Sequence, residues 1–175
     1  MNAEITTARL LMRPPRQDDF EGWAAFDGDA EATRFFGGPK SRAVAWDGLA
    51  MAAGMWSLRG CGLFSVFERE TGQWVGRVGP WVPEGFGLAE VGWAILPSRW
   101  GRGYASEAAD AAVAWAFEHL DWEEARHRID AANLASIAVA QRIGSRWLRE
   151  ETAADGHTVQ VYGQPKARKS GWGSR

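Results

Sequence analysis

The amino-acid sequence predicts a single domain of the mixed α+β class. Helix-like segments come first, a block of strand-like segments follows, and a glycine loop then joins an extended strand to a long helix. A chain of 175 residues is long enough to bury a substantial core. Since neither a repeat nor an interior linker is apparent, we expect one domain over residues 1–165, followed by a disordered basic tail over residues 166–175.

The N-terminal part of the chain carries one short strand pattern and three helical patterns. The strand pattern ends at Pro14, and Gly37-Gly38-Pro39 interrupts the helical periodicity. Asp18 and Asp19 would lie in the first turn of the first helix, where negative charge is favoured. We expect a strand over residues 9–13 and helices over residues 18–27, 30–36 and 41–58.

Strand patterns dominate from Gly62 onward. A turn that contains Gly72 joins the first two strands into a hairpin, and Asp155-Gly156 joins the last two. Between the hairpins, Asn133 caps a helix that ends at Gly144, a residue suited to the left-handed conformation. We expect strands over residues 62–68, 74–79, 88–96, 125–131, 147–151 and 157–162, and helices over residues 108–120 and 133–143.

Composition and charge argue against several classes of protein. The formal net charge of −2 argues against a general nucleic-acid binder. No apolar stretch approaches the length of a membrane span, and no signal peptide is apparent. The single cysteine, Cys61, cannot form an intrachain disulfide, which fits a reducing compartment. We therefore expect a cytoplasmic protein without nucleic-acid or membrane partners, and a homodimer is left open.

The glycine loop around residues 100–107 has the features of an anion site. The first N–H groups of the following helix have no intrahelical acceptor, and the helix dipole favours negative charge there. Gly101 and Gly103 lack a Cβ atom, so a phosphate can approach the backbone closely. A plain strand-to-helix turn is the alternative interpretation. A dinucleotide loop would need a third glycine and a triphosphate loop would need Gly-Lys-Ser/Thr, and this segment has neither.

Residues 95–108 resemble the acetyl-CoA motif of the GNAT N-acetyltransferase superfamily, in its RimJ/RimL-like branch. Other segments resemble the same branch in the same order, so the similarity extends over roughly residues 5–163. Three features depart from the superfamily pattern. Trp100 stands where Gln or Arg is common, although the RimJ/RimL-like branch often has Trp there; Ser145 stands where a phenylalanine is usual; and the loop over residues 81–87 has no match. The further matching segments are residues 9–14, 36–39, 70–72, 75–76, 90–93, 130–136 and 142–144.

The resemblance implies the GNAT fold, in which a central, mostly antiparallel twisted sheet of six to seven strands is flanked by helices and splayed between its fourth and fifth strands. It also implies acetyl-CoA as the acyl donor, with its pyrophosphate on the glycine loop. The pantetheine arm would lie beside the fourth strand and pair with the backbone of Ala94, Ile95 and Leu96. Three of the implied cofactor-binding residues have an alternative role: Asn133 as a plain helix cap, Arg142 as a surface charge and Tyr104 as a packing residue. The implied cofactor-binding residues are Ala94, Ile95, Leu96, Trp100, Gly101, Arg102, Gly103, Tyr104, Ala105, Ser106, Asn133 and Arg142.

The implied reaction is attack of a neutral primary amine on a thioester, which needs a base for the amine and a proton donor for the thiolate. Glu90 is the candidate base because its strand leads to the thioester position, and the alternative is a solvent-facing carboxylate. Ser136 is the candidate donor to the sulfur, and the alternative is a serine that only satisfies a helix backbone group. The predicted last helix contains no tyrosine for that task. We expect no metal, since the three histidines lack metal-site spacing.

The acceptor is expected to be a protein N-terminal amine or a small-molecule amine. A protein that binds CoA for regulation or interaction without turnover is the alternative, and Ser145 and the missing tyrosine leave it open. Aromatic residues that could form a wall of the acceptor site are Trp23, Phe35, Phe36, Trp46, Trp81 and Trp93.

Overall fold

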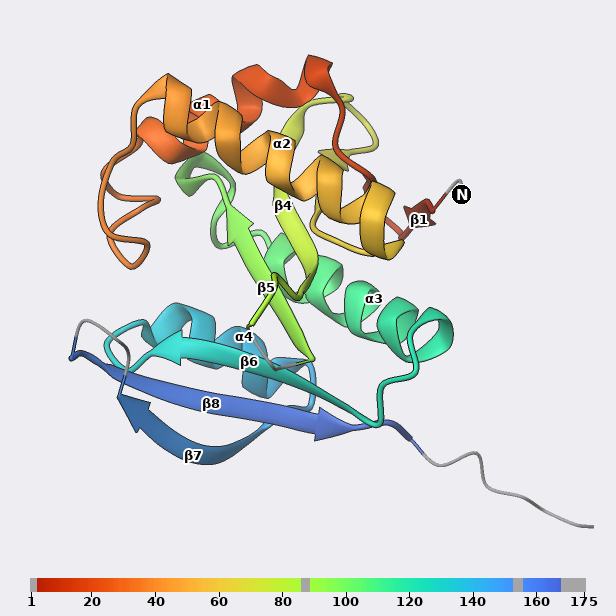
Figure 1. Cartoon of the computed structure of the whole chain (residues 1–175), viewed down its shortest axis with the longest axis vertical. Helices are drawn as coiled ribbons and strands as arrows, with labels where there is room; N and C mark the ends of the chain where they lie inside the picture. The colour runs from red at the N-terminus through yellow and green to blue at the C-terminus, as the bar shows by residue number, and fades with distance from the viewer. Residues whose placement is uncertain (1–2, 86–88, 153–155, 168–175) are drawn as a thin grey trace, which may run out of the picture.

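An eight-stranded sheet forms the centre of the molecule in the computed structural model, and four α-helices pack around it (Figure 1). The structure describes residues 3–85, 89–152 and 156–167, and these counts refer to that part of the chain. The strands are β1 (Ile5–Thr6), β2 (Leu10–Arg13), β3 (Phe64–Glu68), β4 (Trp74–Trp81), β5 (Glu90–Ile95), β6 (Glu124–Asp130), β7 (Arg146–Thr152) and β8 (Thr158–Pro165). The helices are α1 (Phe20–Gly28), α2 (Arg42–Arg59), α3 (Tyr104–His119) and α4 (Leu134–Arg142), with 3₁₀ helices at Gln17–Asp19 and Pro97–Arg99.

The sheet runs in the order β1-β2-β3-β4-β5-β6-β8-β7. Within the described ranges its neighbouring strands are antiparallel except β5 and β6, which are parallel and share a single register pair, Glu90 with Arg126. Beyond that pair the two strands diverge toward their C-terminal ends (Figure 1). The mixed fold class and the splay are thus confirmed, with β5 and β6 as the fourth and fifth strands of the predicted set.

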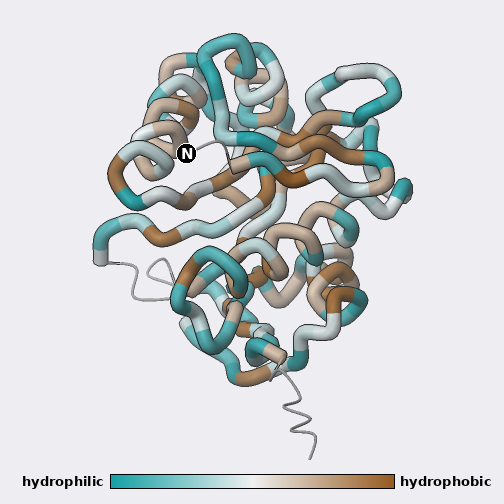
Figure 2. The backbone as a smooth tube through the Cα atoms, turned by 90° about the vertical axis from the view of Figure 1, so that its right-hand side faces the viewer, coloured by the Kyte–Doolittle hydropathy of each residue, from teal (hydrophilic) through white to brown (hydrophobic). Residues whose placement is uncertain are grey.

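The core lies between the central strands and α3. Figure 2 shows hydrophobic residues gathered along the strands at the centre of the molecule. The inward face of α3 is made largely of alanine, and such small side chains let the helix lie close to the sheet. This packing holds the N-terminus of α3 near the end of β5. The residues of this core with no exposed surface are Leu10, Met12, Phe64, Val66, Val75, Val78, Val91, Ala108, Ala109, Ala112, Ala116 and Ala125.

Two expectations about the elements were wrong. Residues 30–36 form turns instead of a helix. The side chain of Asp29 caps the first turn by accepting hydrogen bonds from the N–H groups of Glu31 and Ala32, both at 2.8 Å, and the N–H of Gly38 donates back to the carbonyl oxygen of Thr33 at 3.0 Å, which closes the segment. The turns end at Gly37 and Gly38, which both have φ of +82°. The sheet has eight strands instead of six to seven, since a two-residue strand, β1, precedes the predicted first strand.

Some expectations fall on residues outside the described ranges. These are Asp155 of the last turn, residue Leu88 at the start of the predicted strand over 88–96, and residues 168–175 of the basic tail. Among the helices that the structure does describe, none combines the length and apolarity that crossing a membrane requires.

Candidate active site

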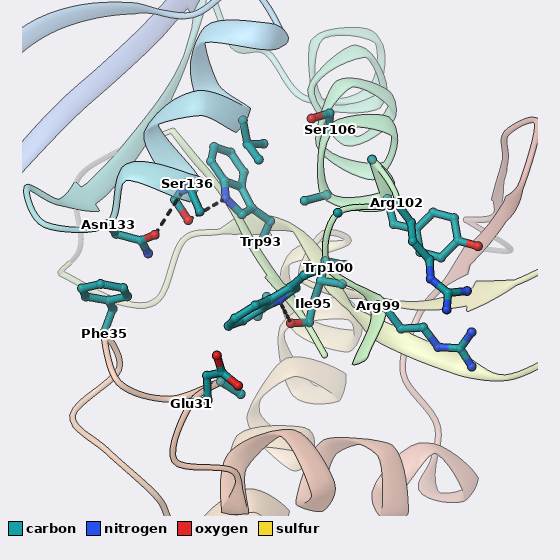
Figure 3. A pocket seen from close by; sticks show the side chains of 18 of the residues that line it. Glu31, Phe35, Trp93, Ile95, Arg99, Trp100, Arg102, Ser106, Asn133 and Ser136 are labelled. Carbon is teal, nitrogen blue, oxygen red and sulfur yellow. Dashed lines mark hydrogen bonds between the residues drawn. The ribbon is translucent and has the colours of Figure 1, made fainter. Parts of the chain in front are cut away.

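A cleft of about 640 Å³ opens where β5 and β6 diverge. Its walls come from β5, the glycine loop, the first turns of α3 and α4, and the turns over residues 31–36. Figure 3 shows Phe35, Asn133 and Ser136 together on one side of the view, and Ser106 and Arg102 on the other. Eleven of the twelve predicted cofactor-binding residues line the cleft, namely Ala94, Ile95, Trp100, Gly101, Arg102, Gly103, Tyr104, Ala105, Ser106, Asn133 and Arg142.

The glycine loop delivers free backbone donors to one end of the cleft. Gly101 and Gly103 have φ of +73° and +79°, a region that residues with a Cβ atom rarely adopt. Gly103 is the N-cap of α3 and has no side chain to cap it, so the N–H groups of the first turn, Tyr104 to Ser106, keep their hydrogen-bonding capacity. Such donors at a helix N-terminus attract an anion.

Side-chain contacts hold the loop in this conformation. The indole N–H of Trp100 donates to the backbone oxygen of Ile95 at 2.7 Å (Figure 3), which ties the loop to the end of β5. Arg9 donates to the backbone oxygen of Arg102 at 2.8 Å and forms an ion pair with Glu107 at 2.7 Å. The loop is therefore fixed from both sides.

Tyr104 has a packing role. Its ring is buried in the core and its hydroxyl donates to the carboxylate of Glu68. That hydrogen bond, together with one from Thr71, holds the pKa of Glu68 below its usual value, so the carboxylate stays charged and pairs with Arg99 at 3.2 Å. Arg99 is thus engaged with the protein itself.

Two other arginines stand at the mouth of the cleft. Arg142, at the end of α4, donates to the hydroxyl of Ser106 at 3.2 Å and so lies beside the first turn of α3. The side chain of Arg102 is half exposed and 4.0 Å from Glu68. The positive charges of Arg102 and Arg142 therefore strengthen the attraction of the α3 N-terminus for an anion.

Along β5, the backbone N–H and C=O groups of every second residue point toward β6, on the side where the two strands diverge. The carbonyl oxygens of Ala89 and Val91 accept from β6, at 2.9 Å and 2.7 Å. The same alternation turns the N–H and C=O groups of Trp93 and the N–H of Ile95 toward the gap between β5 and β6.

The expectation that Ala94 and Leu96 offer backbone groups to the pantetheine arm does not fit this alternation. Their backbone groups point to the opposite side, toward β4, and the N–H of Leu96 donates to Val75 at 3.0 Å. Leu96 also lies outside the cleft lining. Trp93, which the sequence suggested only as an aromatic wall, is the residue whose backbone takes that place.

Asn133 and Ser136 meet at the start of α4. The Oδ1 atom of Asn133 accepts from the N–H of Ser136 at 3.1 Å, so the helix-cap role of Asn133 is confirmed, and its amide NH₂ group remains a donor. The hydroxyl of Ser136 accepts from the indole N–H of Trp93 at 3.2 Å (Figure 3), which leaves its own hydrogen to donate elsewhere. Both side chains therefore keep a donor for a ligand.

Glu90 lies in a smaller pocket of about 110 Å³, which shares Phe35, Trp93 and Ser136 with the cleft. The residue is 9% exposed, so the alternative of a solvent-facing carboxylate is wrong. Burial raises the pKa of Glu90 to about 7, while the nearby Arg128 opposes that shift. Among the described residues, the Oε2 atom has no hydrogen-bond partner.

The aromatic wall is narrower than expected. Phe35, Phe36 and Trp93 line both pockets, whereas Trp23 is a core residue and Trp46 packs edge-on against Phe20 near the surface. Trp81 lines neither pocket. Glu31 and Arg34 also line the cleft, and no signal in the sequence set them apart. Within the described ranges, no group of three or more His, Cys, Asp and Glu side chains is placed to hold a metal ion.

A cleft at the splay of a mixed sheet, with helix N–H groups at one end and a buried carboxyl group beside it, is the arrangement that the resemblance to acetyltransferases implies. The family model of the acetyltransferase (GNAT) domain matches residues 9–146. The chain therefore belongs to the GNAT acetyltransferase family, and it is an N-acetyltransferase.

Two curated relatives are similar in sequence. Over 165 residues, 26% are identical to the uncharacterized N-acetyltransferase p20 of Bacillus licheniformis, which covers 90% of this chain and 92% of p20. Over 90 residues, 33% are identical to the uncharacterized protein YkkB of Bacillus subtilis (strain 168). That second match covers 50% of this chain and spans only about half, 52%, of the length of YkkB.

Solved structures share the fold. An acetyltransferase from Agrobacterium tumefaciens str. C58 superimposes with a TM-score of 0.85 at 30% identity, over 95% of this chain and 96% of that one. The RimL ribosomal L7/L12 α-N-protein acetyltransferase in complex with coenzyme A gives a TM-score of 0.76 at 16% identity, over 93% and 98%. At that identity the second match shows the fold alone.

Proposed function

We propose that this protein transfers an acetyl group from acetyl-CoA to a primary amine, by direct attack within a ternary complex. The acceptor is a protein N-terminal amine or a small-molecule amine, as in the RimJ/RimL-like branch. The observation that carries the proposal is the juxtaposition of three features: the N–H groups at the start of α3 and the open backbone groups of β5 in the cleft, and the buried carboxyl group of Glu90 in the adjoining pocket.

The donor fits this cleft in chemical terms. The N–H groups of the first turn of α3 would bind the pyrophosphate, and Arg102 and Arg142 would add positive charge. The space beside Gly101 is open to the pyrophosphate, since a Cβ atom built on Gly101 meets nothing within 4 Å. The amide groups of the pantetheine arm would pair with the backbone of Trp93 and with the NH₂ group of Asn133.

The thioester would lie beside β5, where a backbone N–H can polarise its carbonyl group. The N–H of Ile95 and that of Trp93 both face the splay and are candidates for this role. The carbonyl oxygen of Ile95 is already engaged by Trp100 at 2.7 Å, which fixes the peptide plane of residue 95.

Glu90 would accept the proton of the attacking amine. A base works best when its pKa lies near the pH of operation, and the pKa of about 7 meets that condition. Its Oε2 atom is the buried acceptor without a partner in the described structure, so a bound amine would satisfy it. Ser136 would donate its hydroxyl hydrogen to the departing thiolate while it accepts from Trp93.

Calorimetric titration tests the donor assignment. We expect acetyl-CoA and CoA to bind with one site per chain. ATP and NAD should not compete, because they lack the pantetheine arm that the backbone of Trp93 and the NH₂ group of Asn133 would bind. An Arg142→Met variant should bind CoA more weakly, by about tenfold, since it loses a charge-assisted contact. Absence of binding by the wild-type protein at millimolar CoA would contradict the proposal.

A further inference from the structure

The hydrogen-bond ladder between β5 and β6 stops abruptly. The N–H of Arg126 donates to the carbonyl oxygen of Ala89 at 2.9 Å, as in a regular parallel ladder. In such a ladder the next bond would run from the N–H of Arg128 to the carbonyl oxygen of Val91. Instead, the carbonyl oxygen of Val91 pairs with a side chain of β6, and the N–H of Arg128 pairs with a side chain of β5.

The side chain of His127 takes the place of the missing ladder bond at Val91. Its Nδ1 atom lies 2.7 Å from the carbonyl oxygen of Val91, and since a carbonyl oxygen only accepts, Nδ1 carries the hydrogen. Its Nε2 atom then accepts from the hydroxyl of Ser145 at 3.0 Å. The Ser145 oxygen in turn accepts from the amide of Gln164 at 3.2 Å. Burial lowers the pKa of His127 to about 4, so the ring is neutral and has one N–H, as this network requires.

The same residues adjoin both candidate substrate sites. The N–H of Arg128 donates to the carboxyl group of Glu90, the candidate base. The ring of His127 lies against the indole of Trp93, with 4.8 Å between ring centres, and that indole donates to Ser136. The imidazole is 1% exposed and Ser145 is 4% exposed, so neither group exchanges its partner for water.

We propose that His127 is a positioning residue that ends the β5–β6 ladder at Val91 and so keeps the backbone of Trp93 open for the pantetheine arm, with Ser145 and Gln164 holding its ring in place. This inference rests on the proposed function, because it assigns the splay to donor binding. It also gives a physical reason for Ser145 where the family usually has phenylalanine: a phenylalanine could not donate to the Nε2 atom of His127.

The test compares three variants with the wild-type protein. His127→Leu removes both hydrogen bonds, His127→Asn can still donate to Val91 because its amide nitrogen reaches the position of Nδ1, and Ser145→Ala removes the donor that orients the ring. CoA affinity is measured by calorimetry, and the KM values for acetyl-CoA and for the amine are measured separately.

We expect His127→Leu and Ser145→Ala to raise the Kd of CoA and the KM of acetyl-CoA by about tenfold, the effect of losing one hydrogen bond between the pantetheine arm and the backbone of Trp93. The KM of the amine should change less, and His127→Asn should recover most of the CoA affinity. Val66→Ala is the control, because it truncates a fully buried side chain in β3, a strand that pairs with β2 and β4 and not with β5 or β6.

A role in folding alone predicts a different pattern. In that case His127→Leu, Ser145→Ala and Val66→Ala would lower thermal stability while the Kd of CoA stayed at the wild-type value, and this would overturn the inference alone. An equal loss of CoA affinity in His127→Asn and His127→Leu would overturn it as well. Failure of the wild-type protein to bind CoA would instead contradict the proposed function, and the inference with it.

Discussion

At the scale of single residues, Glu90 shows how burial changes the chemistry of a carboxyl group. Its pKa of about 7 means that it ionises in the neutral range, so the acid limb of kcat/KM against pH should have its midpoint near 7. Glu90→Gln should remove this limb and lower kcat/KM by about 10²–10⁴-fold, the usual contribution of a positioned base. A Glu90→Gln variant with the wild-type pH profile would show that another group is the base.

Glu90 should also make folding depend on pH. Its pKa is higher in the folded state than the ordinary value of 4.5, so the folded state binds the proton more tightly. The protonated group stabilises the fold below pH 4.5, and this contribution is lost as the pH rises through about 7. The wild-type protein should therefore lose up to about 3 kcal/mol of unfolding free energy between pH 4.5 and pH 8 that Glu90→Gln does not lose, so the difference between the two proteins changes by that amount in favour of the variant. Urea unfolding at several pH values measures this difference, and a constant difference would contradict the assigned pKa.

Single residues also show how far the sequence could lead. The positions of Asn133, Ser136 and Glu90 followed from their places in family motifs, because a motif fixes where a side chain starts. The buried Oε2 atom of Glu90 that lacks a partner among the described residues and the link from His127 to Ser145 depend on contacts between segments far apart in the chain, which no local pattern encodes. The sequence offered one sign of that link, namely a serine at position 145 where the family usually has phenylalanine.

At the scale of elements, the glycine loop and α3 form one functional unit. Gly101→Ala should raise the Kd of CoA by about tenfold, since alanine strains a left-handed backbone and shifts the loop that holds the α3 N-terminus. Gly72→Ala is the matched control: Gly72 has φ of +68° in the β3–β4 turn, also with open space around its Cβ position.

Both glycine variants should lose stability, by about 1–2 kcal/mol, and calorimetry with CoA separates them. Equal CoA affinity in the two variants would show that the loop conformation does not matter for donor binding. Such a result would favour the interpretation of the loop as a plain strand-to-helix turn.

The elements with strong periodic patterns were predicted well, and the failures have local causes. α2 and α3 are long and no proline interrupts them, so their signal is strong. Residues 30–36 have similar spacing, but Gly37 and Gly38 follow with φ of +82° and the N–H of Gly38 donates back to Thr33, so the segment ends before a full helix forms. The strand β1 has two residues, too few for any alternation to appear.

At the scale of the whole molecule, the donor site is assembled from parts that fold together. The N-terminus of α3, the end of β5 and the start of α4 lie on separate segments, and the core between α3 and the sheet brings them together. A ligand that binds only this assembled state must stabilise it. We expect acetyl-CoA at a hundred times its Kd to raise the unfolding free energy by about 2.7 kcal/mol, as thermal or urea unfolding would show. An unchanged unfolding curve would contradict donor binding.

Transfer itself is tested most directly by release of the CoA thiol. Purified protein is mixed with acetyl-CoA and a panel of small-molecule amines and peptides with free N-termini, and free thiol is followed with a colorimetric reagent. We predict amine-dependent thiol release by the wild-type protein and a loss of about 10²–10⁴-fold in Glu90→Gln, which keeps the same affinity for CoA. Tight CoA binding without thiol release for any amine would contradict the account and would identify the protein as a CoA-binding protein without turnover.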